Sequence, residues 1–356
     1  MRTLLLAPTL LAACLVSPQP RALKYGELIE PGAVWSRALV DVAAPLDTVV
    51  LVVGAQSTDE AVLAAAQQVR SQGLQLGYWF EIGRDEALAN AHPEWVASLQ
   101  GHEEWQQQHG AHALAVGEVV QAWPWVPIAY AEVFAVQRDR LAARLAALPP
   151  ADFVFLNDLQ GPPSACGCGN VLCRWATDYT LGGRVPLRSA TPLGNDAAAR
   201  FVCEVAAMVP QSLVIPVWVT ECEEADTVKD GACHGVGCYG GACWREFDAQ
   251  WAPLRAAAPQ VALLLAYRAF GRDLPRFGGT AGWVEFAIEH LRAREKKQHA
   301  RELLGESLLA VVEGWSVDAD VGAQCAHARA AGVTSVLVSR TPIDQSLVPR
   351  VRRGRR

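Results

Sequence analysis

The chain has 356 residues, 51% of them hydrophobic and 19% charged, and its 31 Lys and Arg against 37 Asp and Glu leave a formal charge of −6. This apolar content excludes a disordered chain, and the length fits one large domain or two ordinary ones. The acidic balance argues against a nucleic-acid partner, because a non-specific binder needs a basic face. The unusual components are 12 tryptophans and 10 cysteines.

The N-terminus predicts export. One basic residue precedes the apolar run Leu4–Ala13, which is too short to span a bilayer, where about 20 residues are needed. The segment Leu11-Ala12-Ala13-Cys14 resembles the lipobox of bacterial lipoproteins. The resemblance implies a signal peptide over 1–13, cleavage before Cys14 and lipid on its thiol. We therefore expect a lipid-anchored protein on the periplasmic or cell-surface side, touching the membrane only through the lipid. Plain secretion, with cleavage near Pro18–Pro20, is the alternative.

Apolar runs alternate with helical patterns after a linker over 14–30. Seven buried strands are predicted at Thr48–Gly54, Gln75–Ile82, Phe153–Leu156, Leu213–Val219, Val261–Ala266, Ser307–Val312 and Val333–Val338. An eighth strand, third in order, is expected within Ala113–Ile128. Helices are predicted at Ser57–Gln72, Val136–Leu148, Asp196–Met208, Ala281–Leu304 and Asp318–Ala331.

This alternation predicts an α/β fold, a single (β/α)8 TIM barrel over 31–345 with cysteine-rich loop insertions. No glycine-rich dinucleotide motif follows the first of these strands, and the sequence holds no P-loop, so nucleotide binding lacks its usual support. Residues 346–356 form a basic tail, and its part Arg350–Arg356 is expected to be a frayed end.

Several predicted strands end in carboxylates, at Glu81, Asp158, Glu221 and Glu313. Catalytic groups of TIM barrels come from the C-terminal ends of strands. A pair of such carboxylates suits glycoside chemistry, in which one group protonates the leaving oxygen and the other attacks or activates water. The simpler explanation is that polar residues are tolerated where strands meet solvent.

Two short motifs resemble a known group of proteins. His92-Pro93-Glu94-Trp95 follows the second predicted strand, and Cys166-Gly167-Cys168 with Cys173-Arg174 follows the fourth. Both are similar to segments of exported bacterial TIM-barrel proteins of the glycoside-hydrolase-like type. The cysteine motif departs from theirs by two extra residues before its last Cys. The resemblance implies a barrel and a carbohydrate-related role, and gives His92 a part in substrate binding.

A second resemblance concerns the carboxylates. Asn157-Asp158 on the fourth strand and Glu313 on the seventh look like the four/seven layout of the large barrel-glycosidase clan, where the fourth-strand residue is normally Glu preceded by Asn. Another barrel clan uses a fourth-strand Asp as nucleophile, so the roles of Asp158 and its partner stay open. We expect Asp158 and Glu313 to be catalytic, with Glu221 as the reserve partner.

Substrate contacts are expected from residues beside these strand ends. Sugar rings present apolar faces that pack on aromatic rings. The expected contacts are Trp79, Glu81, His92, Asn157, Tyr267, Arg268 and Trp315. Arg268 suits either a uronic acid carboxylate or an ion pair within the protein. Trp218, in mid-strand, is expected in the core.

Seven cysteines fall in two loops that follow neighbouring strands, at Cys166, Cys168, Cys173, Cys222, Cys233, Cys238 and Cys243. Export favours disulfides, although an odd number leaves one thiol over unless another Cys joins. Structural zinc is the equal alternative, and an iron–sulfur cluster a weaker one. Cys203 and Cys325 are expected to be plain buried residues. No cofactor other than this zinc is predicted.

The leading hypothesis is a glycoside hydrolase that acts on a carbohydrate through a strand-end carboxylate pair. The alternatives are a non-catalytic carbohydrate-binding or scaffold lipoprotein, and a metal- or redox-handling protein centred on the cysteines. The sequence predicts neither the sugar nor an oligomeric state.

Overall fold

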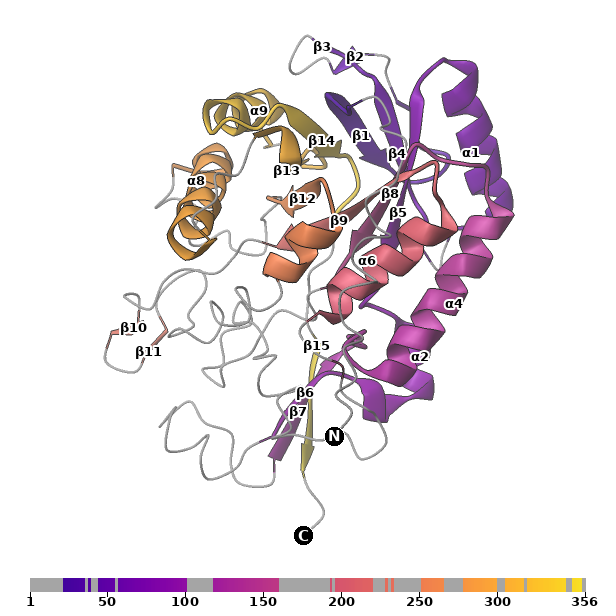
Figure 1. The fold of residues 1–356 in the computed structure, drawn as a ribbon, viewed down its shortest axis with the longest axis vertical. Coiled ribbons are helices and arrows are strands. Elements are labelled where there is room, and N and C mark those ends of the chain that lie inside the picture. Colours follow the sequence, from indigo (N-terminus) through magenta and orange to yellow (C-terminus); the bar gives the residue numbers. More distant parts are fainter. Residues whose placement is uncertain are drawn as a thin grey trace, which may run out of the picture.

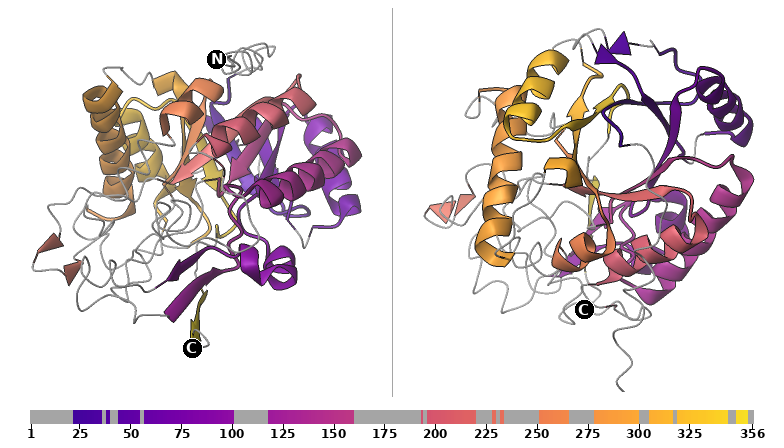
Figure 2. Two further views of the ribbon diagram at one scale, coloured as in Figure 1. Left: turned by 60° about the horizontal axis from the view of Figure 1, so that its bottom comes forward. Right: turned by 45° about the horizontal axis from the view of Figure 1, so that its top comes forward.

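The computed structural model describes residues 22–35, 38–39, 44–54, 57–100, 118–159, 193, 196–219, 228–229, 232–233, 251–265, 278–299, 305–316, 319–343 and 348–353. Eight parallel strands form a closed barrel in the order β1, β4, β5, β8, β9, β12, β13, β14, after which β14 pairs with β1 (Figure 1; Figure 2, right). These strands are β1 (Tyr25–Ile29), β4 (Thr48–Val52), β5 (Gln75–Glu81), β8 (Phe153–Asn157), β9 (Leu213–Val219), β12 (Val261–Leu264), β13 (Leu308–Glu313) and β14 (Ser335–Ser339). The predicted (β/α)8 barrel is confirmed.

Helices surround the barrel, with α1, α4 and α6 along one side and α8 and α9 along the other (Figure 1). They are α1 (Asp59–Ser71), α4 (Ala131–Ala147), α6 (Ala197–Met208), α8 (Thr280–His299) and α9 (Val321–Ala330). Residues 251–257 are also helical. Helix α1 begins where the side chain of Thr58 accepts a hydrogen bond from the backbone N–H of Ala61, a standard N-cap. All five predicted helices are present.

The eighth strand is not where the sequence predicts it. The barrel's first strand is β1, which lies within the segment assigned to a linker, so the barrel begins earlier than expected. The segment expected to hold the third strand instead contains β7 (Glu118–Trp123), which belongs to a separate antiparallel sheet. Because one strand moves from third to first place, β8 and β13 remain the fourth and seventh barrel strands.

The separate sheet joins an insertion to the C-terminal segment. It has the order β15, β7, β6, where β6 is Ser98–Gln100 and β15 is Val348–Arg353 (Figure 1). Six residue pairs connect β15 to β7, from Val348 with Trp123 to Arg353 with Glu118. The expectation of a frayed tail is therefore wrong for Arg350–Arg353.

The insertion after β5 also holds α2 (Glu86–Ala91) and the short 3-10 helix η3 (Pro93–Trp95). They form a small apolar cluster of their own with Val96, Val126 and Tyr130. Two further two-stranded pairs are β2 (Ala38–Leu39) with β3 (Ala44–Pro45), and β10 (Val228–Lys229) with β11 (Ala232–Cys233). A 3-10 turn, η7 (Gly305–Ser307), leads into β13.

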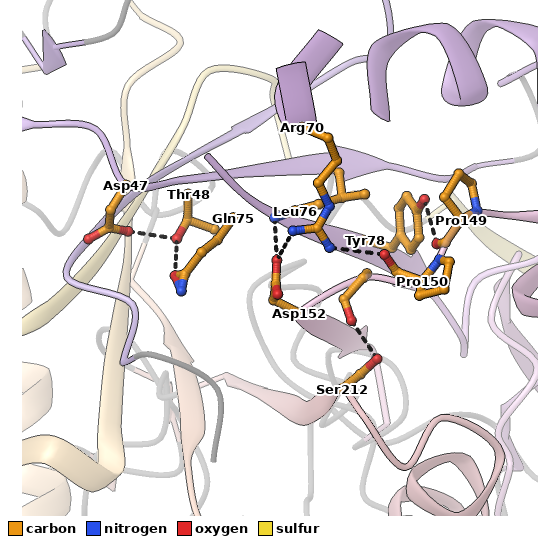
Figure 3. A network of polar contacts seen from close by, with 11 residues as sticks. Asp47, Thr48, Arg70, Gln75, Leu76, Tyr78, Pro149, Pro150, Asp152 and Ser212 are labelled. Carbon is orange, nitrogen blue, oxygen red and sulfur yellow. Dashed lines mark hydrogen bonds and ion pairs between the residues drawn. The ribbon is translucent and has the colours of Figure 1, made fainter. Parts of the chain in front are cut away.

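A polar network closes the N-terminal end of the barrel (Figure 3). The guanidinium of Arg70 donates to Asp152 Oδ2 at 2.6 Å, and the same oxygen accepts the backbone N–H of Leu76 at 2.8 Å. The hydroxyl of Tyr78 donates to Pro149 O at 3.0 Å, and burial raises the pKa of this phenol. These bonds tie α1 and the end of α4 to the strand starts, which leaves the opposite end of the barrel for a site.

Candidate active site

Alternation along β5 decides which of its side chains enter the barrel. Tyr78 bonds to Pro149, just beyond α4, and therefore faces the surrounding helices. Successive side chains of a strand point to opposite faces, so Trp79 and Glu81 face the interior. Glu81 is in register with Asn157 of β8, which places Asn157 on the same face.

Glu81 accepts two hydrogen bonds inside the barrel. The indole N–H of Trp79 donates to Glu81 Oε1 at 2.7 Å, and Asn157 Nδ2 donates to Oε2 at 2.9 Å. Trp79 is 1% exposed and stacks on Phe155, with ring centroids 5.9 Å apart. Trp79 holds the carboxylate of Glu81 in place through this bond. Contact between its ring and a substrate stays a prediction, since the ring is as deeply buried as Asn157 and Glu313.

The bond to Glu81 also orients Asn157. Since Nδ2 donates to the carboxylate, Oδ1 points elsewhere as an acceptor. Asn157 is fully buried, and Oδ1 has no hydrogen-bond partner within the described part of the chain. Leaving a buried acceptor unsatisfied costs about 1–3 kcal/mol. The chain thus carries a buried acceptor that a ligand hydroxyl would satisfy.

Asp158 follows in an uncommon backbone conformation. Its φ is 63°, in the left-handed region, and its side chain is buried with 3% of its surface exposed. A side chain on Gly83 would collide with it, because a Cβ there would lie 2.4 Å from Asp158 O. Strained residues cost about 1–3 kcal/mol and cluster at functional sites. Gly83, which the sequence analysis missed, therefore permits the turn that places Asp158.

Glu313 reaches the interior from the other side of the barrel. Residues paired between neighbouring parallel strands face the same side of the sheet. Following these pairs from Asn157 through β9 and β12 to β13 places Glu313 on the inner face. Following them from Trp79 through β4, β1 and β14 gives the same result. It is the last residue of β13, is 2% exposed and pairs with Ser339 of β14. Glu81, Asn157 and Glu313 are thus the inward residues at the C-terminal ends of three strands, with Asp158 directly after Asn157.

A cavity of about 1050 Å³ adjoins Glu81. It lies between the ends of β4 and β5 and the helices α2 and α4, and ligand pockets commonly have volumes of about 300–1,000 Å³. Ion pairs of Arg140 with Asp85 and of Arg144 with Asp59 line it. Its lining is more apolar than polar, and it runs from the C-terminal ends of β4 and β5 along α4 to Ala147.

Two other predicted contact residues occupy different settings. The ring of His92 stacks on Trp95 with centroids 3.8 Å apart, and its Nδ1 lies 3.1 Å from Glu94 Oε1. A backbone hydrogen bond at Glu94 and then His92 lower the pKa of the Glu94 carboxyl. His92 therefore packs within the insertion. Trp315 follows Glu313-Gly314, is half-buried and packs against the hydrophobic core.

Ten of the predicted site residues belong to parts of the chain that the structure does not describe. Outside the described residues lie Cys14, Cys166, Cys168, Cys173, Glu221, Cys222, Cys238, Cys243, Tyr267 and Arg268. The backbone of Cys233 is part of β11. Among the residues with a described placement, no group of His, Cys, Asp and Glu is arranged to hold a metal, and no helix is long and apolar enough to cross a membrane.

One cysteine prediction is corrected. Cys203, in α6, is disulfide-bonded, whereas Cys325 is a buried, reduced thiol as expected. An alanine-rich helix gives no indication of such a bond, because the partner's proximity depends on the fold.

No protein-family model matches the sequence, and no curated protein is detectably similar to it. Solved structures with a similar fold include the glycoside hydrolase domain of PelA from Pseudomonas aeruginosa, at 14% identity and a TM-score of 0.42 over 89% of this chain and 95% of that one. Others are active domain 2 of a Pyrococcus furiosus chitinase (8%, 0.44, covering 91% and 84%) and the catalytic domain of a Paenibacillus polymyxa β-amylase (7%, 0.43, covering 89% and 92%). Similarity this distant carries no information about the reaction, since one barrel fold supports many chemistries.

Proposed function

We propose that this protein is a glycoside hydrolase whose site lies at the C-terminal end of the barrel. Asp158 and Glu313 form the reacting pair. One protonates the oxygen of the leaving sugar, and the other attacks the anomeric carbon or activates the water that does so. Water is consumed, the glycosidic C–O bond breaks, and the leaving group departs as an alcohol.

The geometry of the consecutive residues Asn157 and Asp158 is the observation that carries this proposal. Asn157 has a buried amide oxygen without a partner among the described residues, and Glu81 holds that amide in orientation. The next residue, Asp158, is buried and has a backbone in the left-handed region. A sugar hydroxyl is a donor of the right kind for Asn157 Oδ1. The cavity beside Glu81 would supply room for a flanking sugar, and Trp315 an aromatic face.

A screen for reducing-sugar release from neutral, acidic and amino polysaccharides tests the proposal. Wild type should cleave at least one of them, and Asp158→Asn should not. Asp139→Asn is the control, because Asp139 is an exposed carboxylate on α4, paired with Arg138. Equal activity in wild type and Asp158→Asn would refute the assignment.

A carbohydrate-binding barrel without catalysis is the second candidate. The burial of both Asp158 and Glu313, at 3% and 2% exposed, favours it, because attacking water must reach the bond. This candidate predicts that wild type binds a glycan on an array and releases no sugar from it.

We further propose that the cysteine-rich loops are crosslinked by disulfides and that the protein is exported. Setting Cys14 and Cys325 apart from the 10 cysteines leaves eight, an even number, of which Cys203 is already oxidised. Cys203 is the additional residue that the seven loop cysteines need. Zinc would instead require free thiolates. Mass spectrometry under non-reducing conditions should find eight oxidised cysteines, and bound zinc with free loop thiols would contradict this.

We propose a lipid anchor at Cys14. Cys14→Ala should then move the protein from the membrane fraction to the soluble exported fraction. Unchanged fractionation would instead support plain secretion or another mode of attachment.

A further inference from the structure

The end of β13 extends beyond its neighbour β12. The last register pair between these strands joins Leu264 to Val311, and the backbone N–H of Leu265 then donates to Val311 O at 2.9 Å. Glu313 lies beyond this point. On its other side the sheet continues, because the N–H of Gly314 donates to Ser339 O at 2.8 Å. Among the described residues after β12, none pairs with the backbone of Glu313, whose N–H and carbonyl bind outside the sheet instead.

Gln324 of α9 provides both partners. Its Nε2 donates to Glu313 O at 2.9 Å, and its Oε1 accepts the backbone N–H of Glu313 at 3.1 Å. The same Nε2 lies 3.4 Å from Asp320 O. Gln324 is fully buried. The backbone N–H can only donate and the carbonyl can only accept, so the orientation of the amide is fixed. Its donor and acceptor bind the backbone of Glu313 as a neighbouring strand would.

The opposite side of this strand end is equally constrained. A Cβ on Gly314 would lie 2.4 Å from Val338 Cγ1 and 3.0 Å from Ser339 O. The end of β13 is thus held between β14 and the amide of Gln324. Because its backbone N–H and carbonyl are both bound, the direction of the Cα–Cβ bond of Glu313 is fixed. The register of β13 with β14 directs this bond toward the barrel interior.

We propose that Gln324 is a positioning residue for Glu313. It fixes the backbone at the end of β13 so that the carboxylate stays directed into the barrel, where it faces the reacting bond. The proposal rests on the function proposed above, because positioning matters only if Glu313 takes part in the reaction. A displacement of about 1 Å at a reacting group lowers the rate by roughly 10²-fold.

Gln324→Leu tests the proposal, with Gln260→Leu as the matched control. Both glutamines are buried, and Gln260 donates to the backbone O of Glu306 at 3.2 Å, next to the start of β13. We expect Gln324→Leu to lower kcat about 10- to 100-fold with KM within about twofold, and Gln260→Leu to leave kcat unchanged. Amide hydrogen exchange of peptide 308–316 should accelerate near Glu313 in Gln324→Leu alone.

Gln324→Glu keeps the proposal testable if Gln324→Leu does not fold. A protonated Glu retains one donor and one acceptor, whereas the ionised form loses the donor. The ratio of its kcat to that of wild type should therefore rise as pH falls. A flat ratio, or faster exchange with unchanged kcat in an active enzyme, would overturn the positioning role. If wild type cleaves no glycan, the proposed function fails and this role with it, and the exchange result then describes a structural contact alone.

Discussion

Replacing Glu81 with Gln tests the hydrogen bonds that orient Asn157. The carboxylate accepts the Trp79 indole N–H at 2.7 Å and Asn157 Nδ2 at 2.9 Å, one on each oxygen. Glutamine keeps one acceptor oxygen and turns an NH2 group toward the other donor. One hydrogen bond to a charged group is lost, worth about 1.5–3 kcal/mol, and a buried donor is left facing another donor.

We expect Glu81→Gln to lower the free energy of unfolding by about 2–4 kcal/mol, measured by urea denaturation. Glu86→Gln is the control, because Glu86 is an exposed residue in the first turn of α2 that also borders the cavity, and its replacement should change stability by less than about 0.5 kcal/mol. If Glu81→Gln is as stable as wild type, the two hydrogen bonds do not hold Glu81 in the way described.

Three further predictions concern Asp158, the disulfide and pH. Gly83→Ala places a Cβ 2.4 Å from Asp158 O, and it should lower stability by about 1–3 kcal/mol and reduce any hydrolysis. Gly54→Ala is the control, because a Cβ there meets nothing within 4 Å, and it should change stability little. Equal melting temperatures of the two variants would contradict the prediction. Cys203→Ser should lose about 2–5 kcal/mol in non-reducing denaturation, against about 1 kcal/mol for Cys325→Ser, and reversal of that order would contradict the crosslink. Burial raises the pKa of Asp47 above 3.8, with hydrogen bonds from Thr48 and Lys24 opposing. The native state then holds this proton more tightly than the unfolded chain does. The stability of wild type relative to Asp47→Asn should therefore fall as pH rises from about 3.5 to 7. An increase in this relative stability would show that the hydrogen bonds outweigh burial.

The strands that the sequence predicts are those with continuous apolar runs. Strand β1 was missed because its sequence, YGELI, places Glu27 in the middle of a short run. Glu27 is buried against Arg340, whose Nε lies 2.9 Å from Glu27 Oε1. That partner is at the far end of the chain, so no local pattern reveals why a carboxylate occupies a barrel strand. The pairing of β15 with β7 is hidden for the same reason.

The site residues also divide into those that the sequence predicts and those that only the fold reveals. The rule that barrel strands end in functional groups led to Asp158, Glu81 and Glu313, because it depends only on where apolar runs stop. Trp79 is enclosed because side chains alternate along β5. Its neighbour Tyr78 bonds to Pro149, beyond α4, so Trp79 faces the barrel interior. Gly83 and Gln324 act through backbone atoms of residues distant in sequence, and their types carry no signal of that role.

The central claim is that Asp158 and Glu313 act as one catalytic pair. Its most direct test is a double-mutant cycle on kcat/KM with Asp158→Asn, Glu313→Gln and the combined variant, each checked for an unchanged melting temperature. Residues that act as a unit give strongly non-additive losses. We predict that each single variant loses about 10³-fold or more and that the combined variant is no slower than the slower single one. Independent, multiplying losses, or full activity in either single variant, would contradict the account.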